Sequence, residues 1–254
     1  MRIALFQSDI QWCNIEANLF NVERVLRTYS QQIDLLILPE MFTTGFCMEA
    51  EALSEEMNGE TWSTLVSWSK IYGVAIVGSF IAKELGRYYN RAFFISPDNE
   101  YWTYDKRHLF SIGSERKCFT AGKDKIIVPY MGWNICLQIC YDLRFPVFSR
   151  CVENEYDLLI YVANWPTSRI DAWNILLPAR AVENQSYVCG VNRVGVDGYG
   201  FKQGGFSSVY SPKGEKLLQL GEKEEVQIID LDLDILHQFR NKFPAWRDAD
   251  KFEC

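Results

Sequence analysis

Hydrophobic and polar positions recur with different periods in successive segments at the start of the chain. Arg2 to Ser8 alternates with the two-residue period of a strand. Apolar residues then recur every three or four positions from Ala17 to Tyr29, behind an Asn14 that suits a helix N-cap. Asp34 to Leu38 is almost wholly apolar, as expected for a strand buried on both faces. Strand, amphipathic helix and buried strand together predict a layered α/β structure.

Similar patterns continue along the rest of the chain. Helical periodicity predicts helices over 61–72, 147–153, 171–186 and 233–239. Short apolar runs bounded by turn residues predict strands over 73–81, 88–96, 100–104, 125–131, 133–139, 156–163, 187–192, 206–210, 216–220 and 225–231. Pro178 lies within the third helix and predicts either a kink or a helix that begins closer to the proline.

The order of these elements predicts the fold class. It is βαβ followed by a meander, then βαβαβ followed by a second meander, which is typical of two mixed sheets packed face to face with helices outside. We therefore expect an α/β fold, a four-layer α-β-β-α sandwich. The 254 residues, 48% of them hydrophobic, suffice for one large core. We predict a single domain over 1–254, with the aromatic tail 241–254 packed on the body or on a partner subunit.

Charge and hydropathy narrow the classes of partner. The formal net charge is −7, and no basic stripe alternates with aromatic residues, so nucleic acid is not an expected partner. No apolar run approaches the roughly 20 residues that cross a bilayer. The N-terminal residues read as a strand and lack the features of a signal peptide. We expect a cytoplasmic protein that acts on a small molecule and not at a membrane.

Cysteine and histidine usage argues against a metal centre. The eight cysteines are scattered without a Cys-x-x-Cys pair, and His108 and His237 are the only histidines. Structural zinc is bound by cysteines or histidines paired at short spacing. We therefore expect no metal and no cofactor, and cysteines that are mostly reduced and structural.

Three chemically potent residues each follow an apolar run directly. Glu40 follows the strand 34–38, Lys106 follows 100–104, and Cys140 ends 133–139, close to a helix start at Pro146. Each has an ordinary structural interpretation, as a loop cap, a solvated cation and a small apolar residue. However, ligands in sheet-based α/β folds gather at strand ends, and backbone N–H groups at a helix start favour a thiolate.

Together these three residue types suit amide hydrolysis at a thiol. A glutamate can take the thiol proton and pass it to the departing amine. An ammonium group can stabilise the oxyanion of the tetrahedral intermediate. A cysteine can hold the acyl group as a thioester.

The motifs around these residues resemble those of the nitrilase superfamily, the carbon-nitrogen hydrolases. The three motifs are Leu38-Pro-Glu40-Met-Phe, Tyr104-Asp-Lys106-Arg-His-Leu-Phe and Ile139-Cys140-Tyr-Asp-Leu-Arg144-Phe. The resemblance implies that Glu40 is the general base and acid, Lys106 the oxyanion stabiliser and Cys140 the nucleophile. It also implies that the backbone N–H of Tyr141 completes the oxyanion hole and that Glu115 is a second catalytic glutamate, which orients the lysine and the substrate nitrogen.

Within the family, the segment Gly190 to Gly198 and the tail Lys242 to Asp250 are similar to the bacterial omega-amidase branch. The resemblance implies hydrolysis of the terminal amide of 2-oxoglutaramate or 2-oxosuccinamate, through a thioester, by at least a homodimer. A substrate carboxylate needs a cation, and the candidates are Arg144, Arg169 and Arg193. Arg144 could instead tie the turn after the cysteine through a carboxylate, and Trp165 could line the pocket or fill the core.

Three other interpretations remain open at the level of sequence. The same chemistry could act on a nitrile, an N-carbamoyl compound or another aliphatic amide. The fold could be a non-catalytic binding module, although the intact Glu40, Lys106 and Cys140 argue against this. The cysteine could also work with His108 in a Cys-His scheme.

Overall fold

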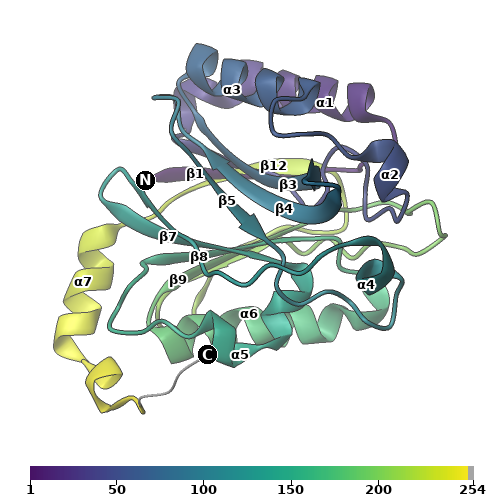
Figure 1. Cartoon of the computed structure of the whole chain (residues 1–254). Coiled ribbons are helices and arrows are strands. Elements are labelled where there is room, and N and C mark those ends of the chain that lie inside the picture. The colour runs from purple at the N-terminus through teal and green to yellow at the C-terminus, as the bar shows by residue number, and fades with distance from the viewer. Residues whose placement is uncertain (251–254) are drawn as a thin grey trace.

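Two six-stranded sheets face each other across the middle of the molecule (Figure 1). The computed structural model describes residues 1–250. The first sheet has the order β12-β1-β2-β3-β4-β5 and the second β11-β10-β9-β8-β7-β6. The strands of the first sheet are β1 (Arg2–Gln7), β2 (Leu35–Ile37), β3 (Ala75–Glu84), β4 (Arg87–Ile95), β5 (Tyr101–Asp105) and β12 (Glu225–Asp230). Those of the second are β6 (Ile127–Tyr130), β7 (Trp133–Ile139), β8 (Leu158–Ala163), β9 (Tyr187–Asn192), β10 (Ser208–Tyr210) and β11 (Lys216–Gln219).

Helices cover the outer faces of both sheets (Figure 1). On the first sheet these are α1 (Ile15–Tyr29) and α3 (Glu60–Tyr72); on the second they are α5 (Pro146–Ser149) and α6 (Ile170–Asn184). Further helices are α2 (Ala50–Leu53), α4 (Glu115–Cys118) and α7 (Leu233–Lys242). The arrangement confirms the predicted four-layer sandwich of two mixed sheets with helices outside.

Local chemistry sets the limits of these helices. The side chain of Asn14 accepts a hydrogen bond from the Ala17 N–H at 3.1 Å, so it is the N-cap of α1 as predicted. Gly73 ends α3 with φ of 66°, a left-handed conformation that glycine adopts without strain. Pro146 opens α5, where a missing N–H costs no helical hydrogen bond.

Strand direction determines where the strand ends gather. β1, β2 and β3 pair in parallel, as do β7, β8 and β9. β5 runs in the same direction as β3, because two antiparallel pairings, β3 with β4 and β4 with β5, separate them. The carboxyl ends of β2 and β5 therefore lie at the same edge of the first sheet.

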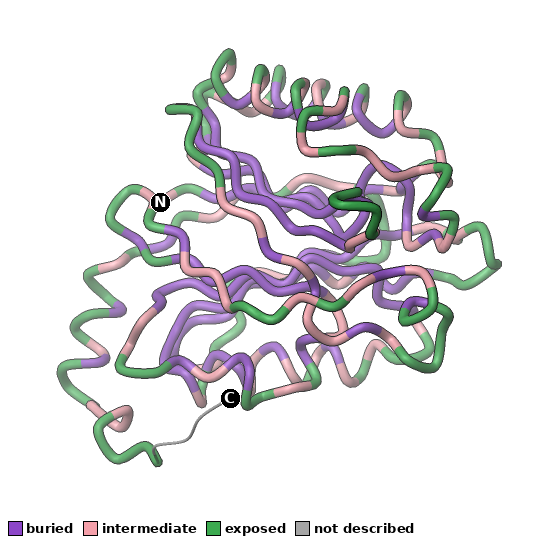
Figure 2. The backbone as a smooth tube through the Cα atoms, in the orientation of Figure 1, coloured by how far each residue is buried: buried purple, intermediate pink, exposed green. Residues whose placement is uncertain are grey.

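Most of the buried apolar surface lies in three layers, and Figure 2 shows buried backbone through both sheets. Side chains such as Leu5, Ile37 and Ile160 form the layer between the sheets. A second layer lies under α1 and α3, and a third under α6. Gly190 lets α6 approach closely, since a Cβ atom there would lie 2.6 Å from Cζ2 of Trp173.

Two predicted helices differ from the structure. Helix α6 runs from Ile170 through Pro178, so it does not begin near the proline. The helix predicted over 147–153 is wrong beyond Ser149, where α5 ends. The chain turns there instead, and Glu153 and Asn154 have φ of 51° and 59°, outside the right-handed helical region.

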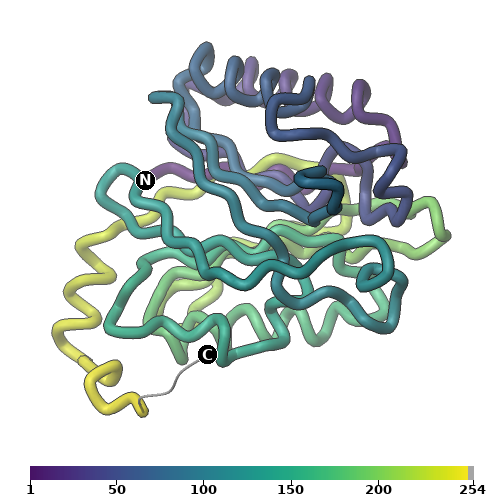
Figure 3. Tube along the Cα trace, viewed as in Figure 1, coloured from purple at the N-terminus to yellow at the C-terminus, as the bar shows by residue number. Residues whose placement is uncertain are grey.

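The first strand of the described chain lies beside a strand that is distant in sequence. In Figure 3 the last strand, β12, runs beside the first, β1, and the two pair antiparallel from Arg2 with Asp230 to Gln7 with Glu225. The tail contacts the body of the protein at Phe243, whose carbonyl accepts a hydrogen bond at 2.8 Å from the side chain of Gln185, the residue after α6. The predicted packing of 241–254 falls partly on residues 251–254, which lie outside the described part of the chain. Within residues 1–250, no helix is both long enough and apolar enough to cross a bilayer.

Candidate active site

A buried lysine lies between two buried glutamates at the strand ends. Glu40 follows β2, Lys106 follows β5, and Glu115 opens the short helix α4. Glu40 and Glu115 are 0% exposed and Lys106 is 1% exposed. Lys106 Nζ lies 2.8 Å from Glu40 Oε1 and 2.9 Å from Glu115 Oε1. Hydrogen-bonded ion pairing makes the burial of these charges tolerable.

Glu40 is held by both sheets. Its Oε1 accepts a hydrogen bond from Asn90 Nδ2 at 2.8 Å, and Asn90 belongs to β4 of the first sheet. Its Oε2 accepts one from the Asn164 backbone N–H at 2.8 Å, and Asn164 follows β8 of the second sheet. The Asn164 side chain in turn donates to the Glu40 carbonyl. The carboxylate is therefore fixed at the seam between the two sheets.

Charge balance in this cluster shifts two pKa values. Burial alone would lower the pKa of Lys106, but the neighbouring Glu115 and Glu40 carboxylates outweigh it and raise that pKa above its ordinary value. Burial raises the pKa of Glu115, the Lys106 charge opposes this shift, and the Glu40 charge adds to it. Glu115 is also held by the Phe110 N–H, which donates to its Oε2 at 2.5 Å.

Cys140 stands at a strained corner beside this cluster. It begins the 3-10 turn η2 (Cys140–Arg144) with φ of 44°, a left-handed conformation that is uncommon for a non-glycine residue. Its Sγ lies 3.7 Å from the Asn164 carbonyl oxygen. Burial and the Glu40 charge raise its pKa well above the ordinary value, although the Lys106 charge opposes them. This shift favours the thiol form of the side chain over the thiolate.

His108 does not pair with the cysteine. Its Nδ1 lies 2.7 Å from Asp142 Oδ1, and its ring stacks on that of Phe145 with centroids 3.9 Å apart. His108 is not among the described residues that line the cavity next to Cys140. The geometry therefore offers no support for the Cys-His scheme.

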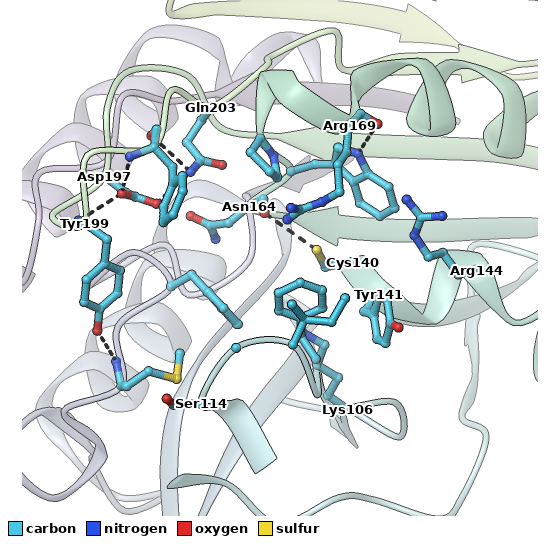
Figure 4. A pocket seen from close by; sticks show the side chains of 18 residues that line it. Lys106, Ser114, Cys140, Tyr141, Arg144, Asn164, Arg169, Asp197, Tyr199 and Gln203 are labelled. Atoms are coloured by element: carbon cyan, nitrogen blue, oxygen red, sulfur yellow. Dashed lines mark hydrogen bonds between the residues drawn. The ribbon is translucent and has the colours of Figure 1, made fainter. Parts of the chain in front are cut away.

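A cavity of about 440 Å³ opens beside Cys140 and Lys106 (Figure 4). Its walls include Tyr141, Arg144 and Trp165, three residues that the sequence put forward for substrate binding. Trp165 is also buried, and its indole N–H donates to the Arg169 carbonyl at 2.8 Å. Both roles predicted for Trp165 are therefore observed, because the ring packs into the core and also lines the cavity.

The structure does not bring Arg193 to this cavity, although the sequence placed it among the candidates. Arg193 is fully buried. Its guanidinium donates to the Ile10 carbonyl at 3.0 Å and to Asp9 Oδ1 at 3.2 Å. Arg193 is not among the described residues that line the cavity, whereas Arg144 and Arg169 both are, so these two arginines remain as candidates to bind a carboxylate.

Two asparagines at the site escaped the sequence analysis. Asn90 is the one uncharged polar side chain among the buried residues of β4, next to the buried Arg91. Asn164 directly follows β8, as Lys106 directly follows β5. An amide in a buried strand is a usable signal, because it needs a polar partner. The identity of that partner depends on which distant strands lie next to each other, and the hydrophobic periodicity of the sequence does not predict this.

Comparisons with known proteins show similarity to carbon-nitrogen hydrolases over nearly the whole chain. The model of the carbon-nitrogen hydrolase family matches residues 2–241 of this chain. The omega-amidase YafV of Yersinia enterocolitica is 42% identical over 255 residues, which cover 99% of this chain and 98% of that protein. The 2-oxoglutaramate amidase of Bacillus subtilis (strain 168) is 30% identical over 253 residues, 98% of this chain and 97% of that protein. XC1258 of Xanthomonas campestris, a CN-hydrolase superfamily protein solved with an arsenic adduct in its active site, is 38% identical and matches with a TM-score of 0.98 over 100% of this chain and 98% of that one.

Proposed function

Since this chain belongs to the carbon-nitrogen hydrolase family, we propose that it is an omega-amidase that hydrolyses small dicarboxylic acid monoamides. It is a hydrolase of carbon-nitrogen bonds other than peptide bonds. The proposed substrates are 2-oxoglutaramate and 2-oxosuccinamate, and the products are ammonia and the dicarboxylate. The observation that carries the proposal is the buried cluster of Glu40, Lys106 and Glu115 beside Cys140, next to a cavity that also holds two arginines.

In the first half of the reaction, Glu40 takes the proton of the Cys140 thiol as the sulfur attacks the amide carbon. The resulting oxyanion is stabilised by the Lys106 ammonium group and the Tyr141 backbone N–H. Glu40 then gives its proton to the amide nitrogen. The carbon-nitrogen bond breaks, ammonia leaves, and the acyl group stays on the sulfur as a thioester.

In the second half, a water molecule takes the place of ammonia. Glu40 removes one proton from this water, and the oxygen attacks the thioester carbon. The carbon-sulfur bond breaks, Cys140 recovers its proton from Glu40, and the carboxylic acid product is released. Because the pKa of Cys140 is raised, a base must act in every turnover, and Glu40 is held at the seam of the sheets to do so.

Glu115 has a supporting part in this scheme. It contacts the Lys106 ammonium group together with Glu40, and it orients the substrate nitrogen. At the other end of the substrate, Arg144 binds the carboxylate, while Tyr141 and Trp165 form the walls. No carboxylate among residues 1–250 forms an ion pair with Arg144, which lies over the Trp165 ring with its Cζ 5.2 Å from the ring centroid. This leaves its charge available to the substrate.

We also propose a cytoplasmic homodimer or higher homo-oligomer. The support for self-association is the resemblance to the family and the exposed apolar side chains Ile175 and Val182 on α6. The mass of the native protein in solution, measured by light scattering for wild type and for an Ile175→Glu, Val182→Glu variant, tests this. A wild-type protein that is monomeric at micromolar concentration contradicts it.

Ammonia release from a panel of substrates tests the proposed activity. Wild type and Cys140→Ala should be compared on 2-oxoglutaramate, 2-oxosuccinamate, glutamine, an N-carbamoyl amino acid and a simple aliphatic nitrile. We expect turnover of the two oxo-amides by wild type only, with an acyl adduct on Cys140 in the mass spectrum of the quenched enzyme. Inert oxo-amides together with turnover of the nitrile would show a different substrate class, and full activity in Cys140→Ala would remove the cysteine from the mechanism.

A further inference from the structure

Two arginines share the cavity with the catalytic thiol. Arg144 is the last residue of η2, and Arg169 is the last residue of the turn η3 (Thr167–Arg169). Each guanidinium lies over an aromatic ring: Cζ of Arg144 is 5.2 Å from the Trp165 ring centroid, and Cζ of Arg169 is 5.1 Å from that of Phe110. Aromatic stacking of this kind holds a guanidinium in place while its N–H groups stay free to bind a ligand.

Neither of these two charges is neutralised within the described part of the protein. No ion pair joins Arg144 or Arg169 to a carboxylate of residues 1–250. Asp197 is the one carboxylate among the described residues that line the cavity. Its oxygens accept from the N–H groups of its own loop at 2.9 Å and from the Gln203 side chain at 2.8 Å. The cavity therefore offers two guanidinium groups to whatever enters.

One substrate carboxylate occupies only one of these groups. A guanidinium binds a carboxylate through two parallel hydrogen bonds, so a single arginine satisfies both carboxylate oxygens. The second guanidinium needs a further acceptor. A 2-oxo acid carries one on the carbon next to its carboxylate, whereas an unsubstituted acid carries two hydrogens there and an amino acid carries a positively charged ammonium group.

The position of the scissile carbon decides which arginine binds which group. That carbon lies on the Cys140 sulfur during the reaction, so the 2-oxo group is closer to the sulfur than the terminal carboxylate is. In the view of Figure 4 the guanidinium of Arg169 points toward Cys140, while that of Arg144 lies farther from the sulfur. The Trp165 indole N–H, bonded to the Arg169 carbonyl, fixes the backbone from which this side chain extends.

We infer that Arg169 is a specificity-determining residue that binds the 2-oxo group and so selects 2-oxo amides over their unsubstituted and 2-amino counterparts. This inference rests on the proposed function and deepens it. With an unsubstituted monoamide the Arg169 guanidinium gains no new partner. With glutamine it faces an ammonium group of the same charge, which disfavours binding.

The test compares substrate pairs that differ only at carbon 2. The specificity constants kcat/KM for 2-oxoglutaramate, glutaramate and glutamine are measured by ammonia release for wild type, Arg169→Met, Arg169→Lys and Arg144→Met. In Arg169→Met, the ratio of 2-oxoglutaramate to glutaramate should fall about tenfold to a hundredfold, the range expected for one charge-assisted hydrogen bond. Arg169→Lys keeps the charge and should recover part of the ratio.

Arg144→Met is the informative contrast, because its carboxylate partner is common to all three substrates. It should lower all three specificity constants by similar factors and leave their ratios close to those of wild type. Arg247→Met is the matched control, since Arg247 also lies over an aromatic ring, at 5.3 Å from Trp246, but lies outside the cavity lining. It should leave both the constants and their ratios unchanged.

The outcomes separate this inference from the proposed function. A wild type that releases no ammonia from any of the three amides overturns the proposed function and this inference with it. An active wild type whose substrate ratio survives in Arg169→Met overturns the inference alone. A general loss of activity in Arg169→Met with an unchanged ratio also overturns it, because a merely structural arginine would act in that way.

Discussion

Asp142 Oδ1 lies 2.7 Å from Nδ1 of His108, and this contact joins the two loops that carry Lys106 and Cys140. The same oxygen accepts the His108 backbone N–H at 3.0 Å. The other oxygen accepts the Tyr104 hydroxyl at 2.7 Å and the Ile139 N–H at 3.0 Å. One buried carboxylate therefore receives four hydrogen bonds, two on each oxygen: three come from Tyr104 and His108 on the Lys106 side, and one comes from Ile139 on the Cys140 side. It sets the position of the thiol relative to the ammonium group.

Replacement of Asp142 by alanine should lower kcat about a hundredfold, since a misplacement of about 1 Å between reacting groups can cost that much. KM should change far less, because Asp142 is not among the described residues that line the cavity. Steady-state kinetics on 2-oxoglutaramate measure both values. Tyr104→Phe removes one of the four donors and serves as the control, with a smaller loss. Equal activity of wild type and Asp142→Ala would contradict this positioning role.

Replacement of His108 by asparagine should leave most of the activity. The asparagine amide nitrogen can take the place of Nδ1 as a donor to Asp142, and no proton passes through the imidazole in the proposed mechanism. The pH profile of kcat/KM is the second measurement, and it should keep its shape. Near-total loss of activity in His108→Asn, with the fold intact by circular dichroism, would favour the Cys-His scheme instead.

Replacement of Glu40 by glutamine should have opposite effects on turnover and on thiol reactivity. Burial and the Glu40 charge raise the pKa of Cys140 in the wild type. Removal of that negative charge leaves Lys106 nearby, so the pKa of Cys140 should fall and its thiolate form at lower pH. Alkylation of Cys140 by iodoacetamide, followed by peptide mass spectrometry, should therefore become faster at pH 7 while amide turnover is lost. An alkylation profile shifted to higher pH would reverse the sign and refute the electrostatic account.

Replacement of Lys106 by methionine should destabilise the fold as well as abolish activity. It leaves Glu40 and Glu115 buried without a cation, and breaking a buried pair of this kind costs about 3–5 kcal/mol. The pKa of Glu115 is already raised by burial, and loss of Lys106 removes the charge that opposes this shift. A carboxyl whose folded-state pKa is raised holds its proton in the folded state, so stability is lost as pH rises through that value.

Urea unfolding at pH 5.5 and pH 8 measures this effect. The deficit of Lys106→Met relative to wild type should be larger at pH 8. The double variant Lys106→Met, Glu115→Gln removes one of the two stranded carboxylates and should regain part of the stability without activity. A deficit that is the same at both pH values would contradict the argument.

Local sequence patterns were sufficient to predict the layers of the fold and to predict that the ends of two strands meet at one edge. Apolar runs ending at Glu40 and Lys106 predicted that these residues lie at one edge, and the structure brings them within hydrogen-bond distance. Glu115 could be placed beside them only through resemblance, since its loop has no periodicity. The early end of α5 at Ser149 was not predictable from the sequence. The chain turns at Glu153 and Asn154 with positive φ, and no glycine marks this turn.

The arginines show where such patterns stop being informative. Arg193 and Arg169 have the same charge and both follow strand ends in sequence. Arg193 is buried by contact with Asp9, 184 positions earlier in the chain, whereas Arg169 remains in the cavity wall. The difference depends on tertiary contacts between segments that no local window includes.

The pairing of β12 with β1 also has a consequence for synthesis. The ribosome makes β1 before β12, and the apolar side chains of β1, from Ile3 to Phe6, are buried in the folded protein. The strand that pairs with one edge of β1 is β12, which emerges only when Asp230 has been added. A growing chain therefore exposes one unpaired edge of β1 until β12 has been made, and unpaired strand edges of this kind favour aggregation when folding is delayed.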